Sequence, residues 1–193
     1  MSFLGMDDEA VKLEMEAILA TPEVTVLGIG NIILCDEGFG VRAAETLDAK
    51  YEFPDNAQIL DGGTLGMELL RFITGTKKLL ILDSINGGEA PGTIFRFEDK
   101  AVIEHFNDKL SAHEVGIQDV LAFLAVSGKA IPNVVVIGAQ PYNLGAGVGL
   151  SPEMEKLLPV MADKAVAELK NWGIELKEKA EVKEVDLHTT TIG

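Results

Sequence analysis

The stretch that decides the fold is VTVLGIG, residues 24–30, an apolar and β-branched run that ends among glycines. A run without polar alternation is typical of a strand that is buried on both sides in a parallel sheet. The segments KKLLILD (77–83) and VVVIGAQ (134–140) have the same character, and AQIL (57–60) is a shorter version of it. We therefore predict a mainly parallel sheet that contains these four segments.

Segments with apolar residues at helical spacing separate these strands. They are residues 6–20, 41–50, 65–73, the stretch VGIQDVLAFLAV (115–126) and residues 151–172. The last segment opens with Ser151-Pro152, a common helix start, and Pro159 is expected to kink it or to keep its first turn separate. TIFRF (93–97) is predicted to be an edge strand. The alternation indicates a three-layer α/β fold, a twisted and mostly parallel sheet of about five strands with helices on both faces.

The chain is expected to form one domain with an extension at each end. Residues 1–22 are predicted to be an N-terminal helical extension, residues 23–173 the α/β domain, and residues 174–193 a polar, disordered tail. No apolar run reaches the roughly 18 residues that a membrane span needs. The N-terminus has acids where a signal peptide has Lys or Arg. A single cysteine, Cys35, suits a reducing compartment, so we expect a cytoplasmic protein without a membrane partner.

The net charge excludes one class of partner. Sixteen basic residues against thirty-one acidic ones give a formal charge of −15. Such a field repels nucleic acid, so no nucleic-acid partner is expected. Solubility explains most of these charges, and we expect the protein to be a monomer.

Acids and one histidine stand where the predicted strands end. Asp36 and Glu37 close the loop after the first strand, Asp61 ends the second strand and Asp83 ends the third. His113 precedes the helix predicted around residues 115–126. Because ligands of open α/β sheets bind beyond the carboxyl ends of the strands, we expect these side chains to lie at one edge. A histidine with two or three carboxylates suits a metal such as zinc or nickel.

Each of these residues also has a structural interpretation. Asp36 and Glu37 precede a helix, where the helix dipole favours acids regardless of function. Asp61, which is followed by two glycines, could bond its own backbone in a turn. Asp83 could cap the next segment, although a buried acid calls for a partner. His113 lies in S-x-x-E, the spacing of a capping box, and spacing alone favours a surface position for it.

The glycines of the first loop permit a second hypothesis. Gly28-Ile29-Gly30 has the start of a G-x-G-x-x-G dinucleotide loop. The third glycine is replaced by Ile33, and the carboxylates of Asp36 and Glu37 would repel a pyrophosphate at the helix start. A nucleotide-binding α/β protein is therefore the weaker alternative.

Longer stretches of the chain resemble one protein family. They are VLGIGNIILCDEGFGVRAAETL (26–47), ILDGGTLGMELL (59–70), LLILDSINGGEAPGTIFRF (79–97), SAHEVGIQDVLAFL (111–124) and VVVIGAQP (134–141). A G-x-G-N-x-x-x-x-D-E-G-x-G loop followed by D-G-G-T and S-x-H-E is far more specific than any single piece. The chain resembles the hydrogenase-maturation endopeptidases, nickel-dependent proteases that process the large subunit of [NiFe] hydrogenases. The likeness covers roughly residues 24–172.

The resemblance implies both a site and a substrate. Glu37, Asp83 and His113 match the metal-coordinating residues of the family, and the metal is nickel carried by the precursor of the large subunit, a place that another divalent cation could take. Asp36 or Asp61 is expected to assist proton transfer as a free carboxylate, and the product is a subunit without its short C-terminal extension. A chaperone that checks the metal of the same precursor without cutting it remains the alternative, because it would use the same residues.

Overall fold

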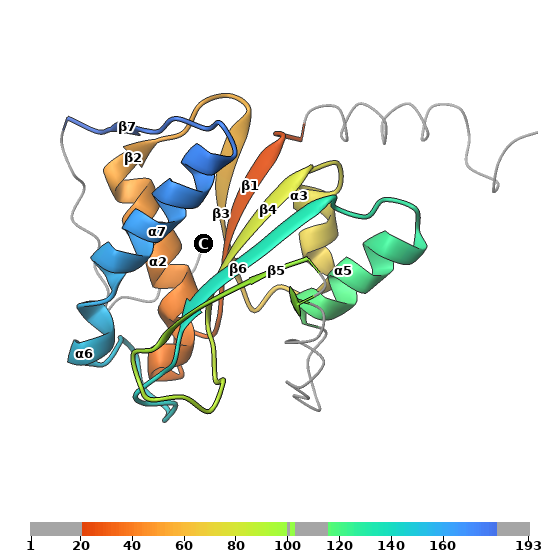
Figure 1. Cartoon of the computed structure of the whole chain (residues 1–193). Coiled ribbons are helices and arrows are strands. Elements are labelled where there is room, and N and C mark those ends of the chain that lie inside the picture. The colour runs from red at the N-terminus through yellow and green to blue at the C-terminus, as the bar shows by residue number, and fades with distance from the viewer. Residues whose placement is uncertain (1–20, 100, 103–115, 181–193) are drawn as a thin grey trace, which may run out of the picture.

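The computed structural model describes residues 21–99, 101–102 and 116–180 (Figure 1). The helix predicted over residues 6–20 and the capping box predicted at residues 111–114, with His113, lie outside the described residues. The described part holds the whole predicted sheet, so the central expectation about the fold can be compared with the structure.

A five-stranded sheet forms the centre of the domain. Its strands are β1 (Val24–Ile29), β3 (Ala57–Gly63), β4 (Lys78–Ser84), β5 (Ile94–Glu98) and β6 (Asn133–Ala139), and they lie in the order β3-β1-β4-β6-β5. The first four strands in that order are parallel, and β5 pairs antiparallel with β6 at the edge. The prediction of a mostly parallel sheet of about five strands, with an edge strand near residues 93–97, is confirmed.

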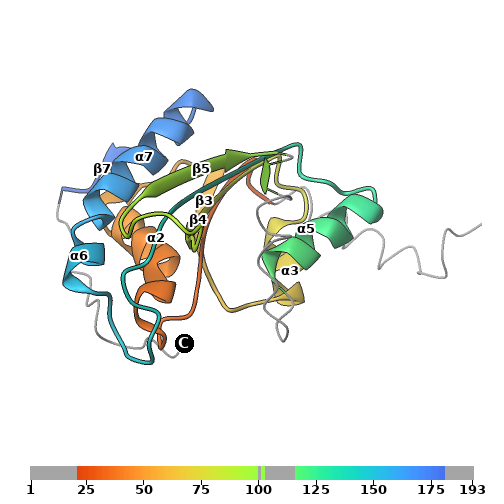
Figure 2. The same cartoon turned by 60° about the horizontal axis from the view of Figure 1, so that its bottom comes forward.

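Helices cover both faces of the sheet, which confirms the three predicted layers (Figures 1 and 2). One face carries α2 (Phe39–Lys50), α6 (Pro152–Glu155) and α7 (Leu158–Asn171). The other face carries α5 (Ile117–Val126) and the short α3 (Leu70–Ile73), which follows the 3-10 turn η2 (Met67–Leu69). The helix predicted over residues 65–73 is therefore divided into a 3-10 turn and one α-helical turn.

Alternate strand residues supply two hydrophobic cores. Val26 and Leu80 pack with α2 and α7 in what we call the first core. Their neighbours Leu27 and Ile81 pack with α3 and α5 in the second core. All four are fully buried, and burial of each such side chain contributes about 1.5–3 kcal/mol. Because both faces of the strands are covered, the strand sequences are apolar throughout.

The segment predicted as one helix over residues 151–172 forms two helices, α6 and α7. Ser151 caps α6, since its Oγ accepts a hydrogen bond from the Met154 N–H at 3.3 Å. Pro159 lies in the first turn of α7, where a missing N–H costs no helical hydrogen bond. The first turn of the predicted segment therefore forms a separate helix, α6, which was one of the two outcomes expected from Pro159.

Residues 174–180 belong to the folded domain, so the expectation of a disordered tail from residue 174 needs correction. Ile174 is 5% exposed and lies in the first core. The short strand β7 (Lys177–Glu178) pairs antiparallel with β2 (Tyr51–Glu52). Backbone hydrogen bonds hold this pair of strands together, and such pairing cannot be recognised from the residue types of a polar segment. Within the described ranges, no helix is both long and apolar enough to cross a membrane.

Candidate active site

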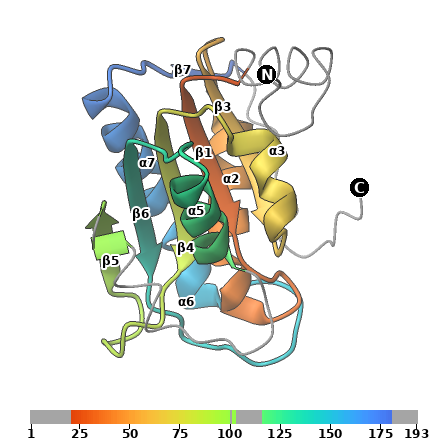
Figure 3. The same ribbon diagram turned by 90° about the vertical axis from the view of Figure 1, so that its right-hand side faces the viewer.

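The carboxyl ends of β1, β3, β4 and β6 lie along one edge of the sheet, the lower edge in Figure 3. Three of the acids singled out by the sequence stand there. Glu37 is in the 3-10 turn η1 (Cys35–Gly38), Asp61 is near the end of β3, and Asp83 is near the end of β4. This is the edge at which ligands of open α/β sheets bind.

Gly40 lets helix α2 begin directly on the strand ends. A Cβ at this position would lie 2.1 Å from the carbonyl oxygen of Leu82 and 2.3 Å from that of Ile29. Only glycine permits so close an approach of helix and sheet backbone. The contact holds the start of α2, and with it the preceding turn that carries Glu37, against the end of β4, where Asp83 follows Leu82.

The glycines of the first loop pack against their own chain. Gly30 has φ 134°, and a Cβ on it would lie 1.9 Å from the Glu37 carbonyl oxygen. A Cβ on Gly28 would lie 2.5 Å from the Gly40 carbonyl oxygen. The G-x-G pattern is therefore explained by contacts within the fold, which removes the main support for the nucleotide-binding alternative.

Asp36 is fully buried, and its carboxylate accepts four hydrogen bonds. The donors are the N–H groups of Tyr142 (2.9 Å), Asn143 (2.8 Å) and Ser151 (2.7 Å) and the Ser151 hydroxyl (3.0 Å). Asp36 is therefore not free, although it was one of the two acids, Asp36 or Asp61, expected to be a free carboxylate. The donors lie 106 to 115 residues further along the chain, so no local pattern could have revealed them.

Asp61 and Asp83 lie on opposite faces of the sheet. Gly28 pairs with Asp61 on one side and with Leu82 on the other, so these two residues are level. Leu82 belongs to the first core, and Asp83, the next residue, faces the layer of α3 and α5. Strand β1 lies between them, which separates their Cα atoms by about 10 Å, two strand spacings. The acids share an edge but do not form one cluster.

Asp83 is only 7% exposed, and the loop that follows it is held by a residue that sequence reasoning missed. One oxygen of the Asp83 carboxylate accepts a hydrogen bond from the Ser84 N–H at 2.7 Å. Further along, the buried Gln140 side chain accepts a hydrogen bond from the Gly87 N–H at 2.9 Å and donates one to the side-chain Oδ1 of Asn86 at 3.0 Å. Gln140 follows β6, a neighbour of β4 in space but not in sequence, so only the tertiary fold could identify it.

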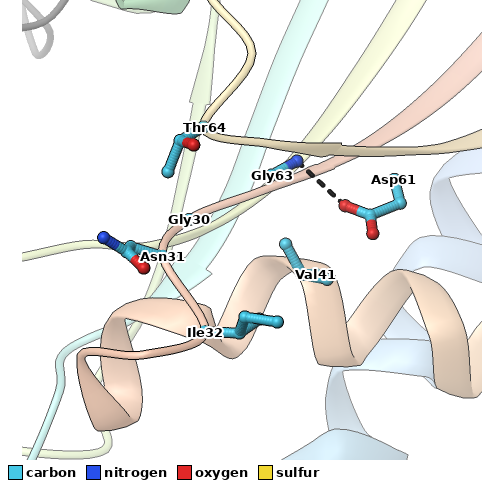
Figure 4. Close-up of a pocket in the computed structure, with 7 residues that line it drawn as sticks. All are labelled: Gly30, Asn31, Ile32, Val41, Asp61, Gly63 and Thr64. Carbon is cyan, nitrogen blue, oxygen red and sulfur yellow. Dashed lines mark hydrogen bonds between the residues drawn. The ribbon is translucent and has the colours of Figure 1, made fainter. Parts of the chain in front are cut away.

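An open pocket of about 190 Å³ lies beside Asp61 (Figure 4). Its lining consists of Gly30, Asn31, Ile32, Val41, Asp61, Gly63 and Thr64. The exposed Asp61 accepts a hydrogen bond on Oδ1 from the Gly63 N–H at 2.9 Å. Residues 61–63 are the end of strand β3 and not a turn, and the pairing of β3 with β1 is irregular at Gly62. Asp61 thus bonds its own backbone and also faces a space that a ligand can enter.

The third predicted metal ligand, His113, lies outside the described residues. The described chain resumes at Gly116, directly before α5, on the face of the sheet to which Asp83 belongs. Among the residues that the structure describes, no three His, Cys, Asp or Glu side chains are grouped so as to hold a metal ion. The metal-binding roles of Glu37, Asp83 and His113 therefore stay predictions.

This chain is similar to known proteins that are hydrogenase maturation proteases. The model of the HycI family, hydrogenase maturation protease, matches residues 41–168. The hydrogenase 2 maturation protease of Escherichia coli K12 is 39% identical over 79% of this chain and 93% of its own length. The hydrogenase expression/formation protein HupD of Rhizobium leguminosarum is 38% identical over 83% and 80%, respectively. The solved structure of the maturating endopeptidase HybD from Escherichia coli matches with a TM-score of 0.78 and 37% identity, over 82% of this chain and 98% of that one.

Proposed function

The chain belongs to the hydrogenase maturation proteases, and we propose that it removes a short C-terminal extension from a nickel-loaded precursor of a [NiFe] hydrogenase large subunit. Family membership supports an endopeptidase that acts on a hydrogenase precursor. One structural observation supports the proposed site. The close contact of Gly40 with the strand ends holds the turn that contains Glu37 at the end of β4, near Asp83.

Nickel enters this proposal as part of the substrate. Carboxylate oxygens together with an imidazole nitrogen suit a borderline divalent metal. Glu37, Asp83 and His113 would complete the coordination of nickel that the precursor already holds. Binding through the metal would then place the scissile peptide bond at this edge of the sheet, so a precursor without nickel would bind weakly.

Of the two acids expected to assist proton transfer, Asp61 is the one that we assign to this role. The carboxylate of the other, Asp36, already accepts four hydrogen bonds from the protein itself. The Gly63 N–H fixes the orientation of the Asp61 carboxylate beside an open pocket. A general base has to come within about 2.6–3.2 Å of the proton it takes, or reach it through one water. Since about 10 Å separates Asp61 from Asp83, an extended substrate segment of roughly three residues would span the two.

The test of nickel recognition uses two forms of one precursor. Purified enzyme is mixed with nickel-loaded and with nickel-free large-subunit precursor, and intact mass spectrometry follows the loss of the tail. We expect cleavage of the loaded form alone. Equal cleavage of both forms would contradict nickel recognition, and a stable complex with an uncut tail would support the metal-checking chaperone instead.

The test of the site uses variants that remove one negative charge each. Glu37→Gln and Asp83→Asn are expected to slow processing by about 100-fold or more, since each removes a ligand at the reacting centre. Glu175→Gln makes the same change at an exposed residue after α7 and should leave the rate unchanged. Unimpaired processing by the first two variants would refute the site.

A further inference from the structure

We infer that Asp36 is a positioning residue: its carboxylate ties the η1 turn to the loop of residues 141–151 and thereby holds Glu37 in place. The inference rests on the proposed function for what Glu37 does, but the coupling between turn and loop is a property of the fold. Local position in the sequence does not distinguish Asp36 from Glu37, since both acids precede the same helix.

The Asp36 carboxylate fastens the loop at both of its ends. Oδ2 accepts hydrogen bonds from the N–H groups of Tyr142 and Asn143 and from the Ser151 hydroxyl, and Oδ1 accepts one from the Ser151 N–H. The three bonds from N–H groups, 2.7–2.9 Å long, have the lengths of charge-assisted hydrogen bonds. Shielding from water strengthens such bonds further. The loop is therefore held at its start and at its end by one side chain.

Backbone hydrogen bonds continue the contact between turn and loop. The Asp36 N–H donates to the Asn143 carbonyl at 3.1 Å, and the Cys35 N–H donates to the Gly147 carbonyl at 2.9 Å. In return, the Gly147 N–H donates to the Ile33 carbonyl at 3.0 Å. Cys35 has φ 47°, a conformation that residues other than glycine keep only where their surroundings enforce it. The hydrogen bonds with the loop hold Cys35 in this conformation.

Glu37 is the next residue in this turn, so its backbone is held from two sides. Its carbonyl oxygen lies against Gly30, and its neighbour Asp36 is bonded to the loop. Without the Asp36 carboxylate, three N–H groups and one hydroxyl would lose their acceptor, and the loop would have to shift for them to find another. The turn would move with it. A displacement of about 1 Å at a reacting group can cost about 100-fold in rate.

Amide hydrogen exchange tests the coupling independently of activity. In full-length Asp36→Asn, one acceptor oxygen becomes an NH₂ group that faces donors, and we expect amides of residues 35–38 and 142–151 to exchange at least tenfold faster. Glu168→Gln is the matched control, since Glu168 is also a buried acid with hydrogen bonds, but to Arg96. It should leave both segments unchanged. Unchanged exchange in Asp36→Asn would overturn the inference. If that variant does not fold, Ser151→Ala removes one of the four bonds; because it also removes the cap of α6, the exchange of residues 35–38 is then the readout.

A double-mutant cycle on processing tests whether Asp36 acts through Glu37. We expect Asp36→Asn to lower kcat by about 10- to 100-fold with little change in KM. Added to Glu37→Gln, it should cause no further loss. Losses that multiply would overturn a role through Glu37. A wild-type rate for Glu37→Gln alone would instead refute the proposed site, and the exchange result would still decide whether Asp36 couples turn and loop.

Discussion

Replacing Gly40 by alanine should destabilise the protein, because the start of helix α2 touches the backbone of two strands. The added Cβ would lie 2.1 Å from the Leu82 carbonyl oxygen and 2.3 Å from the Ile29 carbonyl oxygen. Real Cβ atoms essentially never approach other heavy atoms within 3.0 Å, so the helix start has to move by about 1 Å. Neither oxygen can turn aside as a flexible side chain would, since both belong to central strands of the sheet.

The expected cost follows from two opposing effects. Overpacking of a well-packed interior costs about 1–3 kcal/mol, and two backbone clashes place Gly40→Ala at the upper end. Alanine recovers about 0.5–1 kcal/mol of that through its better helix propensity. The free energy of unfolding should therefore fall by about 2 kcal/mol or somewhat more. For a protein of this length that corresponds to a Tm lower by about 4–10 °C.

Urea unfolding followed by circular dichroism measures this change, and precursor processing measures its effect on the site. At a temperature where the variant is folded, we expect processing to fall at least about tenfold, because the turn with Glu37 moves with the helix start. Gly116→Ala is the control, since nothing lies within 4 Å of its added Cβ and its φ is −86°. Its cost should stay within about 1 kcal/mol. Unchanged stability of Gly40→Ala would refute the requirement for glycine.

Two further changes test other parts of the domain by urea unfolding. Ile174→Ala should lower the free energy of unfolding by about 2–4 kcal/mol, because the Ile174 side chain is in the first core. The control Val126→Ala, at a residue 86% exposed, should change it by less than about 0.5 kcal/mol. Equally small effects of both variants would show that residues 174–180 add nothing to the stability of the domain. Glu168→Gln should lower the free energy of unfolding by about 1 kcal/mol. The Glu168 carboxylate accepts hydrogen bonds from Arg96 at 3.0 and 3.1 Å, and these raise the pKa of the guanidinium. The loss stays small because Arg96 is 44% exposed, so solvent screens the pair. Processing should be unaffected, and a slower rate would contradict the placement of the site at the strand ends.

The order and type of the elements could be predicted because their cause is local. A strand covered on both faces has to be apolar at every position, and VTVLGIG, KKLLILD and VVVIGAQ show this directly. The positions of Glu37, Asp61 and Asp83 at one edge follow from the same argument, since each stands at or beyond the end of such a strand. The polar strand β7 could not be predicted, because its pairing with β2 uses backbone groups that every residue has.

The sequence by itself determined the layered fold and the edge at which its acids stand, because apolar runs and their ends are properties of neighbouring residues. The tertiary structure decided what each acid does there. Asp36 is a buried acceptor because donors from residues 142–151 converge on it, and the register of β1 with its neighbours sets Asp61 and Asp83 on opposite faces. Hydrogen-bond partners and strand register depend on segments far apart in the chain, so no motif around a single acid contains them.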